Sequence, residues 1–235
     1  MSPRAPGRPD RTAPRTEAEL DDLLSRPTTA VVDALRECPG DVAILGAGGK
    51  MGPSLARMVR RAAMAAGAPR RVVAVSRFAS PAAAEQVAQA GVEVIGADLG
   101  DRHALAALPD APNVIFMAGQ KFGTGALPAA TWASNTVLPA LVADRFRDAR
   151  IVAFSTGNVY PLSHTSAGGS RESDPPGPIG EYAWSCLGRE RVLEHASQLR
   201  GTRVALDRLN YAVDLRYGVL VDLAQRVVAG EAIDV

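Results

Sequence analysis

Short apolar runs alternate with helix-like stretches along most of the chain, and this rhythm constrains the fold more than any other feature. The runs lie at 42–45, 71–76, 92–96, 113–117, 151–155 and 202–206. Helical patterns fall between them at 54–66, 81–90, 101–108, 129–148 and 181–199. Such alternation is typical of βαβ units, whose parallel strands are buried on both faces. With right-handed crossovers it predicts an α/β fold of the Rossmann type, a doubly wound parallel sheet with helices on both faces.

Four segments are expected around and within this core. Residues 1–16, which carry Arg and Pro but no apolar stretch, predict a disordered tail. Residues 17–39 predict a helical extension of two short helices separated by Pro27. Residues 40–213 form the expected nucleotide-binding domain. Residues 214–235 predict the start of a short or truncated C-terminal lobe, because the chain ends soon after an amphipathic pattern at 215–229.

The balance of charge excludes several classes of protein. Lys and Arg number 26 against 25 Asp and Glu, a net charge of +1, which leaves no electrostatic footprint for nucleic acid or an anionic membrane. No apolar stretch approaches the roughly 20 residues that span a bilayer. Two distant cysteines and three scattered histidines show no ligand spacing, so no metal site is expected. These features favour a cytoplasmic protein that acts on a small molecule.

A glycine-rich turn follows the first apolar run directly. Gly46, Gly49 and Gly52 form the pattern GxxGxxG between a predicted strand and a predicted helix. In this context glycines allow a tight turn, close approach of backbone N–H groups to a diphosphate, and close packing of helix on strand. The turn therefore predicts a dinucleotide site that includes Lys50 and Met51. Lys50 either pairs with a phosphate or points to solvent.

The end of the second run bears on the choice of coenzyme. A carboxylate at this point accepts hydrogen bonds from the adenosine ribose and favours NAD. Here the chain has Ser76 followed by Arg77, and a guanidinium suits a 2′-phosphate. The pair predicts NADP as the preferred coenzyme, with NAD as the alternative.

Further motifs follow in a characteristic order. They are Ala97-Asp98-Leu99, the strand from Val114 to Ala118-Gly119, Asn135, Phe154-Ser155-Thr156-Gly-Asn-Val159-Tyr160, Pro178-Ile-Gly-Glu-Tyr182 and Arg208-Leu209-Asn210. Together with the glycine turn, they make residues 41–215 resemble the extended short-chain dehydrogenase/reductase superfamily, the NAD-dependent epimerase/dehydratase family.

The resemblance implies roles for these positions. Asp98 and Leu99 would lie against the adenine, and Ala118, Gly119 and Asn135 would lie beside the coenzyme. Thr156 would hydrogen-bond the substrate oxygen, and Tyr182 would be the general acid/base. The family also implies a carbohydrate-like or other hydroxyl or carbonyl substrate and a homodimer formed through the helices at 132–146 and 182–199.

One family position is changed. The family motif YxxxK is here Tyr182-Ala-Trp-Ser-Cys186, and an uncharged thiol cannot lower the pKa of the tyrosine as an ammonium does. Three readings stay open. In the first, another cation replaces the missing lysine, with Lys121 the leading candidate and Arg189 two turns along the helix. In the second, the enzyme uses altered chemistry. In the third, the protein is a non-catalytic NADP(H)-binding sensor.

Overall fold

The computed structural model describes residues 13–210, 212–213 and 216–233, and the chain divides into two units. The larger unit, Pro27–Ala212, contains the whole sheet. The smaller unit combines the chain up to Arg26 with the chain from Val213 onward. Its described helices are α1 (Glu17–Leu24) and α9 (Val219–Ala229), and Arg216 forms an ion pair with Asp21 at 2.8 Å.

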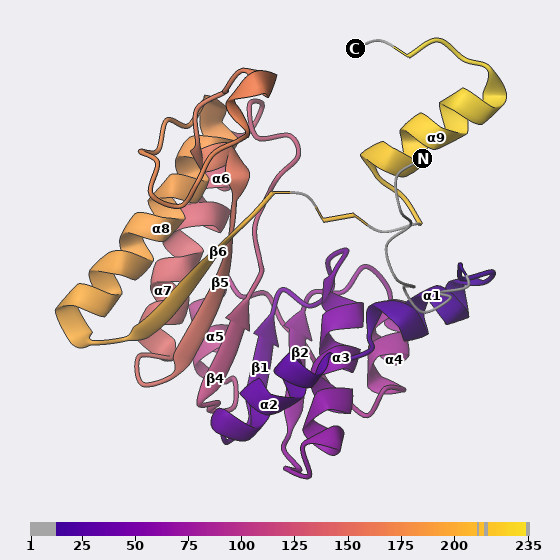
Figure 1. Cartoon of the computed structure of the whole chain (residues 1–235). Coiled ribbons are helices and arrows are strands. Elements are labelled where there is room, and N and C mark those ends of the chain that lie inside the picture. The colour runs from indigo at the N-terminus through magenta and orange to yellow at the C-terminus, as the bar shows by residue number, and fades with distance from the viewer. Residues whose placement is uncertain (1–12, 211, 214–215, 234–235) are drawn as a thin grey trace, which may run out of the picture. The chain divides into compact units, whose positions relative to one another are not determined.

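A parallel sheet of six strands forms the centre of the larger unit (Figure 1). The strands are β1 (Val42–Leu45), β2 (Val72–Ser76), β3 (Glu93–Gly96), β4 (Asn113–Phe116), β5 (Arg150–Thr156) and β6 (Arg203–Leu209). Their order is β3-β2-β1-β4-β5-β6, and every neighbouring pair is parallel. The predicted doubly wound Rossmann-type fold is therefore confirmed. Its topological switch point lies between β1 and β4, where ligands bind in folds of this class.

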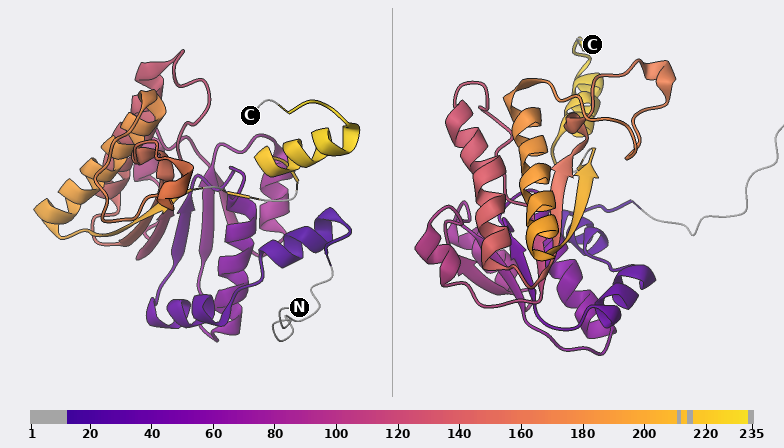
Figure 2. Two further views of the ribbon diagram at one scale, coloured as in Figure 1. Left: turned by 45° about the horizontal axis from the view of Figure 1, so that its top comes forward. Right: turned by 90° about the vertical axis from the view of Figure 1, so that its left-hand side faces the viewer.

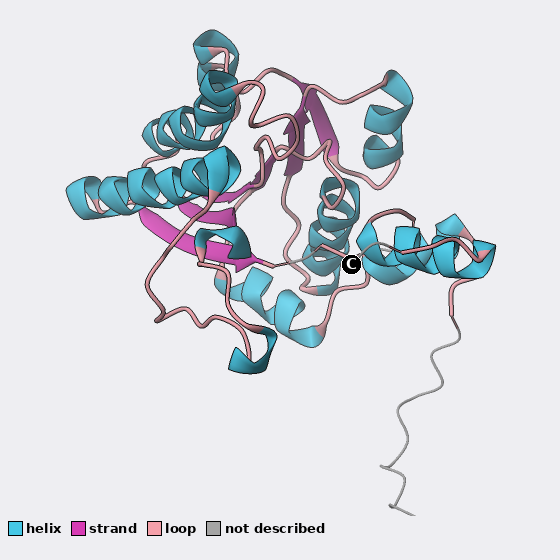
Figure 3. Ribbon diagram, turned by 90° about the horizontal axis from the view of Figure 1, so that it is seen from above, coloured by secondary structure: helices cyan, strands magenta, loops and turns pink. Residues whose placement is uncertain are grey.

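Helices cover the sheet from two sides (Figures 1 and 3). Those of the larger unit are α2 (Thr29–Glu37), α3 (Gly52–Ala65), α4 (Pro81–Ala88), α5 (Arg102–Ala106), α6 (Pro128–Trp132), α7 (Leu138–Arg145) and α8 (Gly180–Arg200). Helices α7 and α8 lie side by side in the right-hand view of Figure 2. The expected order of strands and helices is present, with ends shifted by a few residues.

The alternation of side chains along β1 builds two cores. Ala43 and Leu45 belong to one apolar cluster, which includes side chains of α5, α7 and α8. Val42 and Ile44 belong to the other, which includes side chains of α3 and α4. Because successive strand residues point to opposite faces, an uninterrupted apolar run such as 42–45 is what a strand covered on both sides requires.

The predicted helix at 129–148 is interrupted. A π-helical turn at Ala133–Val137 separates α6 from α7, and the N–H of Leu138 donates to the carbonyl of Ala133. Pro139 follows within the first turn of α7. Proline has no N–H, so it cannot donate to the carbonyl of Asn135 one turn earlier. The wider π turn was not predicted from the spacing of apolar residues.

The terminal segments contain the expected helices, but they do not form a single extension. Helix α2 lies in the same unit as the sheet, whereas α1 lies in the other. Thr16 caps α1, its hydroxyl accepting from the N–H of Glu19 at 3.2 Å. Of the predicted tail, residues 1–12 lie outside the described residues, whereas Arg15 donates from its N–H to the Glu19 carboxylate at 2.7 Å. None of the described helices is long and apolar enough to cross a bilayer.

Candidate functional site

The turn after β1 is fixed by close contacts at two of its glycines. Gly46 has φ +93°, and a Cβ there would lie 2.5 Å from the backbone nitrogen of Ala118 after β4. A Cβ at Gly52 would lie 2.1 Å from the carbonyl oxygen of Ala47. The N–H groups of Gly46 and Ala47 both donate to the carbonyl of Val75 in β2. Packing inside the protein therefore requires glycine at 46 and 52.

Gly49 is different. A Cβ at this position would meet only the carbonyl oxygen of Gly46, at 3.7 Å, which is ordinary contact. None of the described residues around it requires glycine there. Gly49 lines a cavity of about 760 Å³, so a side chain at 49 would take up space that a ligand could use. This is the arrangement in which backbone N–H groups approach a phosphate closely.

The cavity runs along the carboxyl ends of β1, β2, β3 and β4. Its size falls within the range of about 300–1,000 Å³ that holds small ligands and cofactors. The lining residues are Gly46, Gly48, Gly49, Ser76, Arg77, Phe78, Ala79, Ala97, Asp98, Leu99, Gly100, Met117, Ala118, Gly119, Gln120, Ala133, Ser134, Val137, Leu138 and Leu141. Eight of the predicted cofactor residues thus line one cavity: Gly46, Gly49, Ser76, Arg77, Asp98, Leu99, Ala118 and Gly119. The other four predicted cofactor residues are not among the lining residues. Lys50, Met51 and Gly52 follow Gly49 in the chain, and Asn135 lies in the π turn.

Ser76, Arg77 and Asp98 form the end of the cavity next to β2 and β3. The guanidinium of Arg77 lies 3.8 Å from the Asp98 carboxylate, and both side chains are exposed, at 80% and 58%. A pair so exposed contributes little stability and leaves Arg77 available to another anion. A Cβ at Gly48 would lie 2.6 Å from the hydroxyl oxygen of Ser76. The turn and the end of β2 are therefore in close contact.

Asn135 is fully buried in the π turn and joins three segments. Its side-chain oxygen accepts from the N–H of Gln120 at 2.8 Å, and its amide donates to the Gln120 carbonyl at 2.9 Å. The same amide donates to the Ser185 hydroxyl of α8 at 3.0 Å. The side chain is engaged in positioning the loop after β4 against α8.

Arg189 is also buried, with 6% of its surface exposed. Its guanidinium donates to the Phe154 carbonyl at 2.5 Å, to the Asn135 carbonyl at 3.3 Å and to the Asn135 side-chain oxygen at 3.0 Å. It lies 5.6 Å from the centre of the Phe116 ring. Burial lowers the pKa of this guanidinium.

Tyr182 and Thr156 lie together, as the resemblance implies. Burial raises the pKa of the Tyr182 phenol, and the neighbouring Cys186 raises it further. A hydrogen bond with Thr156 and the charge of Arg189 lower it, but they do not offset burial. Burial likewise raises the pKa of the Cys186 thiol. Thr156 also accepts from the N–H of Asn158 at 3.2 Å, so it caps its own turn as well.

Lys121, the leading candidate for a substitute cation, is placed differently. Its side chain is exposed in the loop after β4, and it is not among the described residues that line the cavity. Among the described residues, Arg189 is the cation whose charge lowers the pKa values of Tyr182 and Cys186.

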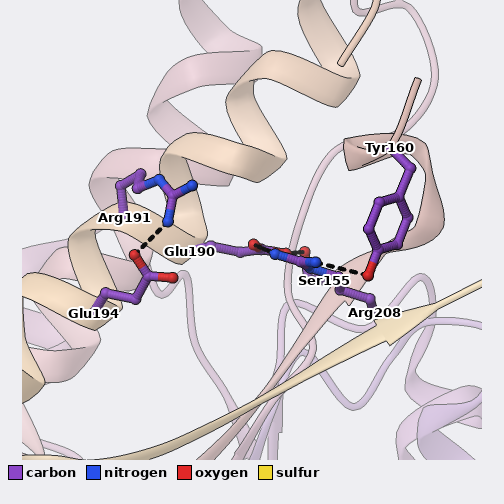
Figure 4. Close-up of polar contacts among 6 residues, drawn as sticks. All are labelled: Ser155, Tyr160, Glu190, Arg191, Glu194 and Arg208. Carbon is purple, nitrogen blue, oxygen red and sulfur yellow. Dashed lines mark hydrogen bonds and ion pairs between the residues drawn. The ribbon is translucent and has the colours of Figure 1, made fainter. Parts of the chain in front are cut away.

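A buried ion pair holds α8 to the sheet (Figure 4). The Glu190 carboxylate, with no exposed surface, accepts from Arg208 of β6 at 2.8 and 3.0 Å and from the Ser155 hydroxyl at 2.5 Å. Arg208 also donates to the Tyr160 hydroxyl at 2.7 Å. Ser155 precedes Thr156, so this network fixes both the strand end and the helix that carry the candidate reactive pair.

Ser185 and Glu190 were not anticipated as parts of this region, and Arg189 was named without its burial. A signal was present, because Tyr182, Ser185 and Arg189 follow one another at helical spacing on one side of α8. Among the described residues, no group of three or more His, Cys, Asp or Glu side chains is placed to hold a metal ion.

Solved structures share this architecture. The UDP-Glc/GlcNAc 4-epimerase of Campylobacter jejuni superposes with a TM-score of 0.65 at 21% identity, over 82% of this chain and 63% of that one. The UDP-glucose 4-epimerase of Thermus thermophilus, in complex with NAD, gives 0.63 at 22% identity, over 82% and 64%. The UDP-glucuronic acid 4-epimerase of Bacillus cereus, also with NAD, gives 0.65 at 17% identity, over 81% and 64%.

The chain has the fold of these 4-epimerases. The comparison confirms the fold that the resemblance implies. This chain covers less than two thirds of the length of each of those proteins. No protein-family model matches the chain, and no curated protein matches its sequence.

Proposed function

We propose that the 760 Å³ cavity binds a nicotinamide dinucleotide, with its diphosphate against the turn of Gly46, Gly49 and Gly52. The observation that carries this proposal is Gly49, which lines the cavity although packing within the chain does not require glycine there. Two solved neighbours of the same fold hold NAD, which supports this class of ligand.

The topology of the sheet favours one orientation of the bound dinucleotide. In a doubly wound sheet a dinucleotide crosses the switch point, with one half over each set of strands. The adenosine half would lie over β1, β2 and β3, beside Ser76, Arg77 and Asp98. The nicotinamide half would lie over β4 and β5, beside Ala118 and Gly119. Because Arg77 is exposed at this rim and position 76 carries no carboxylate, NADP is the preferred form.

The reaction we propose is hydride transfer at a hydroxyl or carbonyl carbon of a carbohydrate-like substrate. The bound dinucleotide would accept or supply the hydride. Transfer at such a carbon also requires a proton to move on its oxygen, and we assign this step to Tyr182, which is hydrogen-bonded to Thr156. Since its pKa is raised, Tyr182 is protonated at neutral pH and acts as the donor in the direction of reduction. The carbohydrate class rests on the sugar-nucleotide epimerases that share the fold.

A second function is favoured by one specific observation. Cys186 stands where the family has lysine, and both Cys186 and Tyr182 have raised pKa values. A protein that binds the dinucleotide as a sensor, without turnover, would tolerate this pair. Turnover of NADPH on a panel of sugar and other carbonyl compounds separates the two functions, because a sensor binds the coenzyme and leaves it unchanged.

Titration calorimetry of the full chain with NADPH and with NADH tests the binding proposal. We expect both to bind and NADPH to bind more tightly. Gly49→Ala should keep the thermal stability of the natural protein and bind NADPH about tenfold more weakly or worse, because one hydrogen bond to a charged group contributes about 1.5–3 kcal/mol.

Gly52→Ala is the matched control, since its Cβ would meet backbone inside the protein and not the ligand. It should lose stability by about 1–3 kcal/mol, as overpacking does. Absence of binding heat for both coenzymes with folded protein would exclude the proposed function. Full affinity in Gly49→Ala would exclude the diphosphate position.

A further inference from the structure

Arg189 is a buried cation whose direct partners are neutral. Its three hydrogen bonds end on the carbonyl oxygens of Phe154 and Asn135 and on the amide oxygen of Asn135. A buried charge is costly unless it is hydrogen-bonded, and a direct carboxylate partner is the usual solution. The described contacts of Arg189 supply hydrogen bonds without cancelling the charge.

The carboxylate adjacent to Arg189 in the chain already has hydrogen-bond partners. Glu190, the next residue, accepts three hydrogen bonds from Arg208 and one from Ser155. Figure 4 shows the contact between this carboxylate and Arg208. The set of buried Arg189, buried Glu190 and partly exposed Arg208 therefore carries a net positive charge of one. The other titratable groups that act on Arg189 are Tyr182 and Cys186.

The guanidinium lies directly behind the cavity wall. A Cβ at Gly119 would lie 2.4 Å from Nη2 of Arg189 and 2.9 Å from the side-chain oxygen of Asn135. Gly119 lines the cavity at the end of β4, and Phe154, which accepts from Arg189, belongs to β5. The charge is thus placed under the half of the sheet where the nicotinamide would lie.

The backbone around Arg189 accommodates its side chain. Pro139 cannot donate to the Asn135 carbonyl, and that carbonyl accepts from Nε of Arg189 instead. Glycine at 119 leaves the volume that the guanidinium fills. Two independent features of the chain therefore accommodate an arginine at this point of α8.

We propose that Arg189 is a positioning residue which supplies the positive charge of the nicotinamide half of the site, in place of a lysine at position 186. This proposal rests on the proposed function. The charge acts in two ways. It stabilises the phenolate of Tyr182 relative to the same site without a cation, and it favours the neutral, reduced nicotinamide over the cationic, oxidised ring.

The first experiment compares the dissociation constants of the oxidised and reduced coenzyme by calorimetry. Arg189→Gln removes the charge and keeps hydrogen-bond donors. We expect its preference for the reduced form to fall by about tenfold, since a charge several ångströms away in a partly buried site contributes on this order. Arg189→Lys keeps the charge and should retain the preference of the natural protein.

Arg191→Gln is the matched control. Arg191 lies on the same helix but is exposed and pairs with Glu194 at 2.6 Å (Figure 4). This variant should bind both forms as the natural protein does. A folded Arg189→Gln with an unchanged preference, or an Arg189→Lys that loses it, would overturn the proposal.

The second experiment needs no coenzyme. In protein labelled with 3-fluorotyrosine, whose phenol titrates at lower pH than tyrosine, ¹⁹F resonances follow each phenol, and Tyr182→Phe identifies the signal of residue 182. We expect its titration midpoint to move to higher pH in Arg189→Gln, by about one pH unit for a tenfold effect. In Arg191→Gln the midpoint should be unchanged. An unmoved midpoint would contradict the role of Arg189, whether or not a coenzyme binds. Failure of both coenzymes to bind would instead refute the proposed function.

Discussion

Tyr182 combines partial burial with two polar neighbours, and burial is the largest influence on its pKa. Thr156 and Arg189 act against burial, and Cys186 acts with it. The phenol is therefore neutral over the physiological range and can give a proton more readily than it can take one. A site of this kind favours the reductive direction, in which the carbonyl oxygen must be protonated.

This protonation state predicts the pH dependence of catalysis. Because the pKa is raised above its ordinary value of 10.0, NADPH-dependent reduction should stay level with respect to this group from pH 7 to 9 and decline only above pH 10, as the donor is lost. Tyr182→Phe should lower kcat by about 10²–10⁴-fold at all these pH values. Steady-state rates on a carbonyl substrate provide the measurement. A variant as active as the natural protein would remove Tyr182 from the mechanism.

At the scale of elements, α8 is the part on which the site depends. One side of it carries Tyr182 and Cys186, and a turn further on Arg189 binds the π turn while Glu190 binds β6. The helix is therefore fixed to two different neighbours by side chains adjacent in sequence. Movement of α8 would displace the candidate proton donor from Thr156.

Breaking the Glu190–Arg208 pair should be costly. Arg208→Met leaves the carboxylate buried without its partner, and we expect a loss of about 3–5 kcal/mol in the free energy of unfolding. Urea denaturation followed by tryptophan fluorescence measures it. Arg191→Met, which breaks the exposed pair with Glu194, should cost no more than about 1 kcal/mol. Equal losses in the two variants would show that the buried pair has no special weight.

Elements with strong local patterns were predictable from the sequence. The strand at 42–45 and the glycine turn after it are encoded within one short stretch, because burial on both faces and a tight turn each demand particular residues. The break at 133–137 was not, because π turns are rare single-turn bulges within helices and the apolar pattern at 129–148 was interpreted as one continuous α-helix.

The polar contacts of the site depend on residues distant in sequence. Asn135 was named from the family motif, yet its bonds to Gln120, Ser185 and Arg189 arise only when three segments pack together. Arg189 is a charged residue in a helix, which ordinarily indicates a solvent-facing position. Only the structure shows that it is buried behind Gly119.

At the scale of the whole molecule, two partly exposed tryptophan side chains lie on the helices beside the site. Trp184 of α8 is 51% exposed, and Trp132 of α6 donates from its indole to Glu181 at 2.6 Å. The helices at 132–146 and 182–199 are those through which the family resemblance implies a homodimer. Aromatic residues exposed in this way are enriched in the cores of protein interfaces.

We therefore expect the chain to be dimeric in solution. Light scattering coupled to size-exclusion chromatography would give the mass of a dimer, and Trp184→Glu should shift it to that of a monomer while circular dichroism stays unchanged. Val228→Glu, an exposed apolar position on α9, is the matched control and should leave the mass unchanged. A monomeric natural protein, or a dimer that survives Trp184→Glu, would contradict this interface.

Gly119 and Arg189 compete for the same volume, because the Cβ that residue 119 lacks would fall on the guanidinium of residue 189. Their identities are therefore linked across 70 positions of sequence. An alignment of homologues should show the two columns changing together: members with a side chain at 119 should lack arginine at 189 or turn its guanidinium away, and would have to place the charge elsewhere.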